Sequence, residues 1–150
     1  MTTTLTPVLQ LPYPDGNELV RDGDNAIAAL AQAVEAALNP PWTVITLNAT
    51  FTARAGHYAP AYRVFLDGTV VLRGGIDKST NIASTNTPFT LPAAARPTAI
   101  VAVPFGVSRA AATNSAVGRL DIATTGVATV NVIDTGTTTW MSLDGIRFSK

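Results

Sequence analysis

Side chains with the types and spacing that catalysis requires are scarce in this sequence. The one histidine, His57, lies in the run Arg54-Ala55-Gly56-His57-Tyr58. No serine, cysteine or carboxylate stands at a companion spacing that would predict a catalytic triad or dyad. A lone histidine beside a glycine is typical of a surface or interface position. We therefore expect no catalytic residue and no enzymatic activity.

Metal and cofactor sites are not indicated either. The chain has no cysteine and no second histidine to complete a zinc site. It lacks a Walker loop, a dinucleotide-binding fingerprint and an EF-hand loop, and Gly74-Gly75 is too short for a phosphate cradle. We expect no metal ion, no cofactor and no disulfide.

Paired carboxylates are the remaining route to hydrolysis, because a glycosidase needs two of them ~5 to 10 Å apart. Five of the ten acidic residues precede residue 40: Asp15, Glu18, Asp22, Asp24 and Glu35. Asp67 and Asp144 each precede a glycine and are interpreted as turn formers. The remaining three are Asp77, Asp121 and Asp134. Nothing in the sequence brings these three together, so a glycosidase is kept only as an alternative.

Carbohydrate binding requires exposed aromatic rings and planar polar groups, because sugars offer C–H faces for stacking and hydroxyl pairs for hydrogen bonds. Candidate residues lie in or near loop-like stretches of the sequence: Tyr58, Asn81, Asn86, Phe105, Arg109, Asn114 and Trp140. Each aromatic has core packing as its alternative. The stretches 78–87 and 112–115 are low in charge and rich in hydrogen-bonding groups, as recognition loops are, although plain connectors look similar.

Composition restricts the partners. Ten basic and ten acidic residues cancel, so a surface for nucleic acid or anionic lipid is not indicated. Only 13% of the residues are charged while 47% are apolar, a shortage of solvating charge that burial in an oligomer would relieve. The N-terminus lacks a signal peptide and no apolar run is long enough to span a membrane, so we expect synthesis in the cytoplasm.

Three segments are expected to position these residues. Residues 1–21 form an extended N-terminal arm, because three prolines and a glycine prevent a regular helix: Pro7, Pro12, Pro14 and Gly16. Residues 22–39 form the one helix, with Asp22 or Asp24 as its N-terminal cap and an alanine-rich interior. Residues 40–150 form the head domain.

The predicted helix carries a narrow apolar seam with steps of three and four residues: Ile27, Leu30, Val34 and Ala37 or Leu38. A seam of this length favours self-association around a symmetry axis or packing on the helix's own domain. Periodicity does not choose between two and three helices. We expect Ile27, Leu30, Val34 and Ala37 to form an oligomer interface.

The head is predicted to be mainly β, an antiparallel β-sandwich or jelly roll, because β-branched residues dominate and turn signals recur every ~8 to 15 residues. The expected strands are 43–52, 61–66, 69–76, 98–105, 116–123, 127–133 and 138–148. At Thr124-Thr125-Gly126, a two-residue turn would mix polar and apolar partners on both faces. A three-residue loop instead aligns Leu120 with Val130 on an apolar face and Asp121 with Thr129 on a polar face, with Gly126 in a left-handed conformation.

The hairpin at Asp67-Gly68 is expected to be apolar on both faces in any register. One face carries Tyr62, Val64, Val70 and Leu72, and the other carries Phe65 and Val71. We expect Phe65 and Val71 to meet a neighbouring subunit, with burial inside the same domain as the alternative.

The order of these segments resembles that of a known family. Residues 6–14 and 22–27 with the alanine-rich helix resemble the N-terminal segments of minor tail and tail-fibre proteins from phages of Gram-positive, especially actinobacterial, hosts. Four stretches of the head resemble the C-terminal domains of the same proteins: Tyr62–Gly74, Phe89–Pro92, Arg96-Pro97 and Trp140–Phe148. Together they extend over nearly the whole chain.

The resemblance implies a homotrimeric β-sandwich head at the distal part of a phage tail or baseplate, with binding of host-surface polysaccharide as a frequent role. It implies no catalytic residues, and it implies contacts of the N-terminal arm with other virion proteins. The chain has no long shaft between helix and head, which favours a compact tip or baseplate appendage. The alternatives are a purely structural virion protein, such as a capsid decoration, head-fibre or tail-tip protein, and a free-standing carbohydrate-binding or adhesion module.

Overall fold

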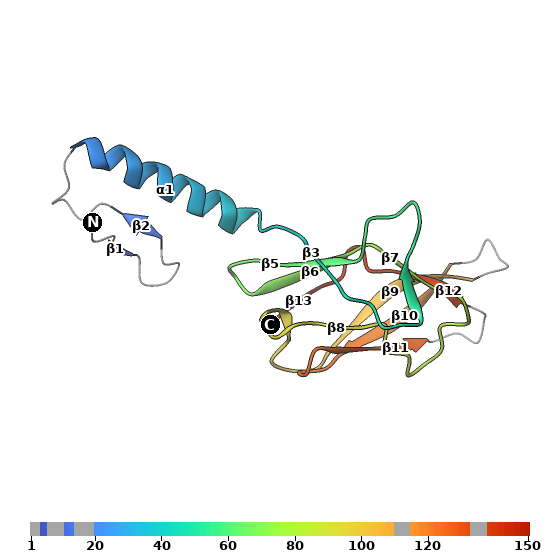
Figure 1. The fold of residues 1–150 in the computed structure, drawn as a ribbon. Coiled ribbons are helices and arrows are strands. Elements are labelled where there is room, and N and C mark those ends of the chain that lie inside the picture. Colours follow the sequence, from blue (N-terminus) through green and yellow to red (C-terminus); the bar gives the residue numbers. More distant parts are fainter. Residues whose placement is uncertain (1–3, 6–10, 14–19, 110–114, 133–137) are drawn as a thin grey trace. The chain divides into compact units, whose positions relative to one another are not determined.

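A computed structural model describes residues 4–5, 11–13, 20–109, 115–132 and 138–150 of the chain (Figure 1). The chain divides into two compact units. The first comprises Met1–Pro41 together with Phe65–Asp67, and the second comprises Trp42–Val64 together with Gly68–Lys150. Antiparallel strands dominate and one long helix is present, which confirms the predicted fold class.

The first unit contains a two-stranded ribbon and a helix. Strand β1 (Thr4–Leu5) pairs antiparallel with β2 (Pro12–Tyr13), and helix α1 spans Val20–Leu38. The helix begins two residues before the predicted start, so Asp22 and Asp24 lie within its first turns and neither is the N-terminal cap. Its end is closed by the Asn39 amide, which donates to the Glu35 carbonyl at 3.0 Å, as expected before two prolines.

The second unit is a sandwich of two antiparallel sheets. The seven-stranded sheet has the order β4 (Phe51–Ala53), β7 (Gly75–Lys78), β12 (Thr138–Ser142), β9 (Val101–Arg109), β10 (Ser115–Ile122), β11 (Val127–Val132) and β8 (Phe89–Thr90). The four-stranded sheet has the order β13 (Arg147–Ser149), β6 (Thr69–Arg73), β5 (Ala61–Val64) and β3 (Thr43–Val44). A short 3-10 helix, η1 (Ala93–Ala95), follows β8.

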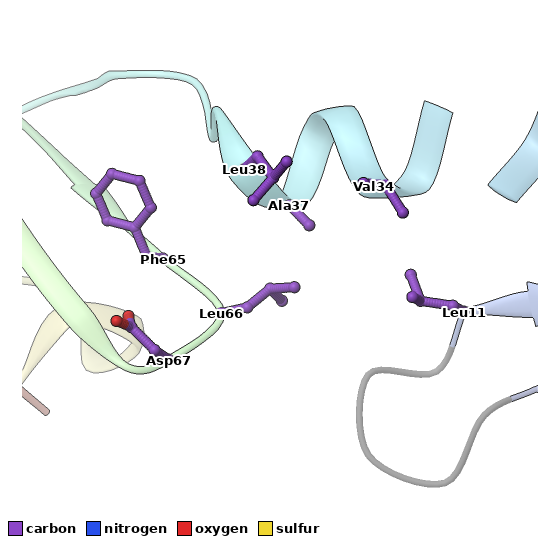
Figure 2. A pocket seen from close by; sticks show the side chains of 7 residues that line it. All are labelled: Leu11, Val34, Ala37, Leu38, Phe65, Leu66 and Asp67. Atoms are coloured by element: carbon purple, nitrogen blue, oxygen red, sulfur yellow. The ribbon is translucent and has the colours of Figure 1, made fainter. Parts of the chain in front are cut away.

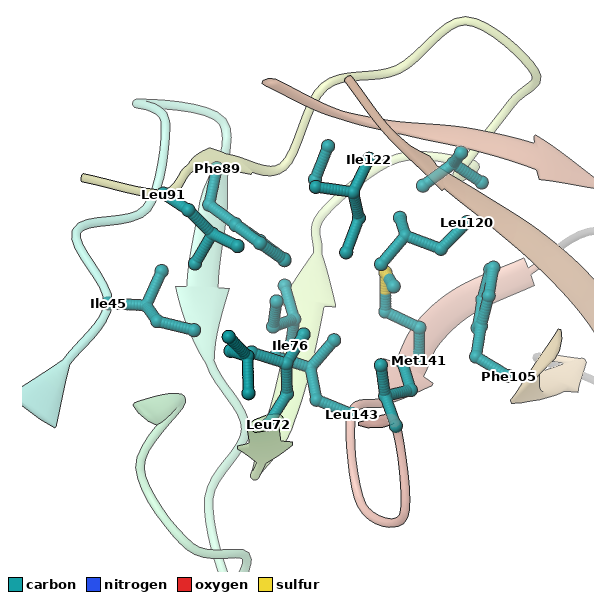
Figure 3. Packing of buried hydrophobic residues seen from close by; sticks show 14 of the residues in the cluster. Ile45, Leu72, Ile76, Phe89, Leu91, Phe105, Leu120, Ile122, Met141 and Leu143 are labelled. Carbon is teal, nitrogen blue, oxygen red and sulfur yellow. The ribbon is translucent and has the colours of Figure 1, made fainter. Parts of the chain in front are cut away.

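The core lies between the inward faces of these two sheets (Figure 3). Leu72 on β6 and Leu120, Ile122 and Met141 on strands of the other sheet are at most 1% exposed. Side chains that alternate with them point outward, as the pleat of a half-buried strand requires. The sandwich therefore leaves the outer face of each sheet available for function.

Three stretches predicted as single strands are each two strands in different sheets. Residues 43–52 give β3 and β4, residues 69–76 give β6 and β7, and residues 138–148 give β12 and β13. Each prediction was wrong because one strand was extended across residues that are depleted in strands: Asn48 lies between β3 and β4, Gly74 between β6 and β7, and Asp144-Gly145 between β12 and β13. Gly74 marks one crossing with φ +103, and Gly145 marks another with φ +84.

Hydrogen bonds join the crossing at Gly74 to the crossing at Gly145. The Gly74 amide donates to Asp144 Oδ1 at 2.9 Å, and the Leu143 amide donates to the Gly74 carbonyl at 2.8 Å. Ser142 Oγ donates to the second carboxylate oxygen of Asp144 at 3.1 Å. Asp144 is therefore a turn former, as predicted, and it also joins one corner of the sandwich to the other.

The hairpin at Gly126 has the predicted register. Leu120 faces Val130, Asp121 faces Thr129, and Arg119 faces Asn131. Gly126 has φ +86, and its amide donates to the Ala123 carbonyl at 2.8 Å to close the loop. One face is buried and the other carries a hydrogen-bonded Arg119, Asp121 and Asn131.

The hairpin at Gly68 differs from the prediction on one face. Val64 faces Val70 and Tyr62 faces Leu72 on the inward side, as expected. The other side is not apolar throughout, because Val71 lies between Arg63 and Arg147 in register. Phe65 and Val71 are half-buried. Their place in a subunit interface stays a prediction.

Candidate functional site

The outer face of the seven-stranded sheet carries a cluster of polar and aromatic side chains. Trp140 on β12 faces Asp77 on β7 in register, and Asp77 in turn faces Thr52 on β4. Arg54 follows directly after β4. Because their inward neighbours Met141 and Ile76 are fully buried, Trp140 and Asp77 point away from the core.

Arg54 links the tryptophan to the carboxylate. Its guanidinium carbon lies 4.3 Å from the centroid of the Trp140 ring, and Nη1 lies 2.7 Å from Asp77 Oδ1. The Arg54 and Asp77 side chains are 32% and 33% exposed. A guanidinium held by a carboxylate on one edge and by a ring on one face has little freedom left, so the three side chains form a pre-organised surface.

The loop between β4 and β5 completes this cluster. The His57 ring lies 5.2 Å from the Trp140 ring at an interplanar angle of 48°, and Tyr58 is 69% exposed. A Cβ on Gly75 would lie 2.9 Å from Arg54 Cβ and 3.2 Å from His57 Cβ, so glycine at this position lets the loop lie on β7. His57 and Tyr58 line an open pocket of about 510 Å³ together with Gly56 and Asp144.

This geometry offers the kinds of group that sugar binding uses. Trp140 and Tyr58 offer ring faces for C–H stacking, and Arg54, Asp77 and His57 offer planar hydrogen-bonding groups beside them. A glycosidase pair is not formed by Asp77 and Asp121, because their strands are three places apart in the sheet, roughly 14 Å at the usual strand spacing of about 4.8 Å. Asp134 lies outside the described residues.

Three of the other predicted ligand residues do not join this cluster. Phe105 is 4% exposed within the core, which removes it from the candidates. Asn81 Oδ1 accepts from the Thr138 amide at 2.6 Å, and Asn86 Oδ1 accepts from Lys78 Nζ at 2.6 Å, so both amides hold their loop on the sheet. Arg109 is the last residue of β9, and Asn114 lies outside the described residues.

Two members of the cluster, Trp140 and Tyr58, were among the ligand residues predicted from the sequence, and three were not: Arg54, His57 and Asp77. Arg54 and Asp77 stand 23 positions apart and are brought together by the pairing of β4 with β7, which the merged strand 69–76 concealed. His57 was placed correctly at the surface, but its proximity to Trp140 has no local signal in the sequence.

A second cavity belongs to the first unit and is apolar. It measures about 620 Å³ and is lined by Leu11, Val34, Ala37, Leu38, Phe65, Leu66 and Asp67 (Figure 2). Six of these seven residues are apolar, so it lacks the hydrogen-bonding groups that a sugar requires. Three of the residues predicted to form an oligomer interface line it: Val34, Ala37 and Phe65.

Membrane-spanning helices and metal clusters are both absent from the described part of the chain. None of its helices has the length and apolar character needed to cross a membrane. Within the same residues, no three histidine, cysteine or acidic side chains converge as a metal site would require.

Comparisons with known proteins find likeness in structure alone. No protein-family model matches the chain, and no curated protein sequence does. The head domain of lactococcal phage bIL170, described as a receptor binding domain, matches with a TM-score of 0.53 and 16% identity over 75% of this chain and 97% of that one. The receptor binding protein (gp15) of Listeria phage PSA matches with a TM-score of 0.51 and 21% identity over 89% of this chain and 81% of that one. This chain therefore has the fold of phage receptor-binding head domains.

Proposed function

We propose that this chain is a receptor-binding protein of a phage tail or baseplate and that its head binds carbohydrate on the host cell surface. The fold likeness to two phage proteins that bind receptors supports the first part. The observation that carries the second is the Trp140 ring, held beside Arg54, Asp77 and His57 on an outer sheet face. We name Trp140, Arg54, Asp77, His57 and Tyr58 the aromatic site.

Assembly and chemistry complete the proposal. The chain acts as a homotrimer, its N-terminal arm contacts other virion proteins, and it works in the virion without enzymatic activity. The exposed apolar residues of α1, with Ile27 at 62% and Leu38 at 73%, support the oligomer. The separation of Asp77 from Asp121 across the sheet supports binding without hydrolysis.

The test is binding of the full-length chain, fluorescently labelled, to cell walls prepared from a panel of Gram-positive bacteria. We expect saturable binding to the host's walls that free wall polysaccharide competes away. Trp140→Ala should weaken this binding at least tenfold, about 1.4 kcal/mol, because the ring stacks on the sugar. Val117→Ala is the matched control, since Val117 is 58% exposed on the same sheet but outside the aromatic site.

Two outcomes would contradict the proposal. If the wild-type chain and labelled virions both ignore host walls, the protein is a structural virion component instead. If incubation with wall polysaccharide releases shorter saccharides, the protein is an enzyme.

A further inference from the structure

The outer face of the four-stranded sheet gathers arginines from three strands. Arg63 on β5 and Arg147 on β13 both face Val71 of β6, and Arg73 follows two residues later on β6. Trp42 lies against this face, with its ring 4.6 Å from the Arg63 guanidinium carbon and 4.1 Å from that of Arg73. We name Arg63, Arg73, Arg147 and Trp42 the arginine face. The chain as a whole has a formal net charge of zero, so this is a local excess of positive charge.

Arg73 is the best-placed cation of the arginine face. Its guanidinium carbon lies 4.1 Å from the Trp42 ring and 4.9 Å from the Tyr58 ring. Contact with two aromatic rings leaves the N–H groups at the edge of the guanidinium plane to find partners elsewhere. Among the described residues, no carboxylate lies within 4.0 Å of Arg73, and its buried Nε has no hydrogen-bond partner.

Two other arginines of the head differ from Arg73 in having a carboxylate partner. Arg54 is paired with Asp77 at 2.7 Å, and Arg119 is paired with Asp121 at 2.9 Å. The nearby Asp144 has its carboxylate oxygens committed to the Gly74 amide and to Ser142 Oγ. Arg73 therefore has the stacking that orients a guanidinium and lacks the internal carboxylate that would satisfy it.

Tyr58 connects Arg73 to the aromatic site. It lines the open pocket with His57 and Asp144, and its ring also contacts the Arg73 guanidinium. A chain-like ligand that stacks on Trp140 and continues past His57 would pass Tyr58 and then meet Arg73. Tyr58 therefore links the two sites: it follows His57, whose ring contacts Trp140, and its own ring contacts the Arg73 guanidinium.

We infer that Arg73 binds an acidic group, a phosphate diester or a carboxylate, of the same surface polymer whose sugar occupies the aromatic site. This inference rests on the proposed function. Arginine forms paired hydrogen bonds with both kinds of acidic group, and desolvation by Trp42 and Tyr58 strengthens them. The polymer is consequently an acidic one, and Arg73 selects it over a neutral polymer of the same sugars.

The first experiment tests the acidic group directly. The full-length chain is titrated with inorganic phosphate, acetate and uncharged methyl glucoside while the indole N–H resonance of Trp42 is followed by NMR. We expect a saturable shift with phosphate or acetate and none with methyl glucoside. Arg73→Gln should abolish the shift, whereas Arg119→Gln, which removes the same charge from the other sheet, should leave it. No saturable shift with either anion would overturn the inference.

The second experiment separates this inference from the proposed function. Binding to host cell walls is measured for wild type, Arg73→Gln, Arg73→Lys and Arg119→Gln at low and high salt. Arg73→Gln should bind about tenfold more weakly at low salt, and the difference should shrink at high salt. Arg73→Lys keeps the charge but loses the paired hydrogen bonds of the guanidinium, so its binding should fall between those of wild type and Arg73→Gln. Partial binding by Arg73→Lys would show that the loss in Arg73→Gln is not misfolding.

Chemical treatment of the walls identifies the acidic group. Removal of phosphate by hydrofluoric acid lowers wild-type binding if the group is a phosphate diester, and amidation with carbodiimide does so if it is a carboxylate. If neither treatment lowers binding, or if Arg73→Gln binds as wild type does, the inference fails while the proposed function stands. An acidic segment of another virion protein would then be indicated if Arg73→Gln lowers incorporation into particles. If the wild type binds no walls at all, the proposed function itself fails.

Discussion

Gly126 and Gly145 have nearly the same backbone conformation but different surroundings. Their φ angles are +86 and +84. A Cβ on Gly126 would collide with the Leu91 carbonyl oxygen and lie 3.0 Å from Arg96 Cγ, whereas nothing lies within 4 Å of the same position on Gly145. Replacing Gly145 by alanine therefore measures the cost of the left-handed backbone alone. Replacing Gly126 by alanine measures that cost together with the cost of a steric collision.

We predict that Gly145→Ala lowers the free energy of unfolding by about 1 kcal/mol, because only the left-handed conformation is penalised. Gly126→Ala should lower it by about 3 kcal/mol or more, since the methyl group also displaces Leu91 or Arg96. Urea denaturation of both variants beside wild type measures the two values. If both variants lose the same free energy of unfolding, the edge formed by β8 and β11 moves enough to accommodate the methyl group at little cost.

At the scale of elements, the alternation of apolar and polar residues and the position of a glycine predict the strand register well within a single hairpin. Leu120 and Val130 face each other as expected, because an apolar and a polar face left a single acceptable register and Gly126 marked the loop. The crossings between sheets were not predicted. Between Thr69 and Ile76 the sequence offers only the pair Gly74-Gly75, and glycines by themselves do not tell a bend within one strand from a change of sheet.

The same limit applies to the aromatic site. Trp140 and Tyr58 were candidates because an aromatic ring in or near a loop-like stretch of the sequence can stack on a sugar, with core packing as the alternative. Arg54 and Asp77 become a site only when β4 and β7 lie side by side in the seven-stranded sheet. Such sites depend on sheet order, which periodicity along the sequence does not encode.

The corner formed by Gly74 and Asp144 gives a prediction at this scale. Asp144→Ala leaves the amide of the buried Gly74 without its acceptor, so the free energy of unfolding should fall by about 1 to 2 kcal/mol. Asp144→Asn keeps an oxygen at Oδ1 and should lose less. Urea denaturation checks both, with an unchanged dependence on denaturant expected for each. An Asp144→Ala chain as stable as wild type would mean that water replaces the carboxylate at the corner.

At the scale of the whole molecule, apolar surface is distributed unevenly. In the second unit, most large apolar side chains are in the core between the sheets. On α1, by contrast, Ile27, Val34 and Leu38 are 62%, 37% and 73% exposed. A helix with this much exposed apolar surface is marginal by itself, and association with copies of itself would bury that surface.

We predict that the full-length chain has a mass in solution of about three times its 15.6 kDa chain mass at micromolar concentration. Ile27→Asp and Val34→Asp each place a charge in the apolar seam of α1 and should shift the mass toward that of a single chain, because burial of an unpaired carboxylate is strongly unfavourable. Gln32→Asp adds the same charge at an exposed position outside the seam and should leave the oligomer intact. Sedimentation equilibrium measures the mass of all four proteins.

A wild-type mass near 15.6 kDa would refute the trimer. If Gln32→Asp dissociates the oligomer as readily as Ile27→Asp, the charge itself rather than the seam would be responsible.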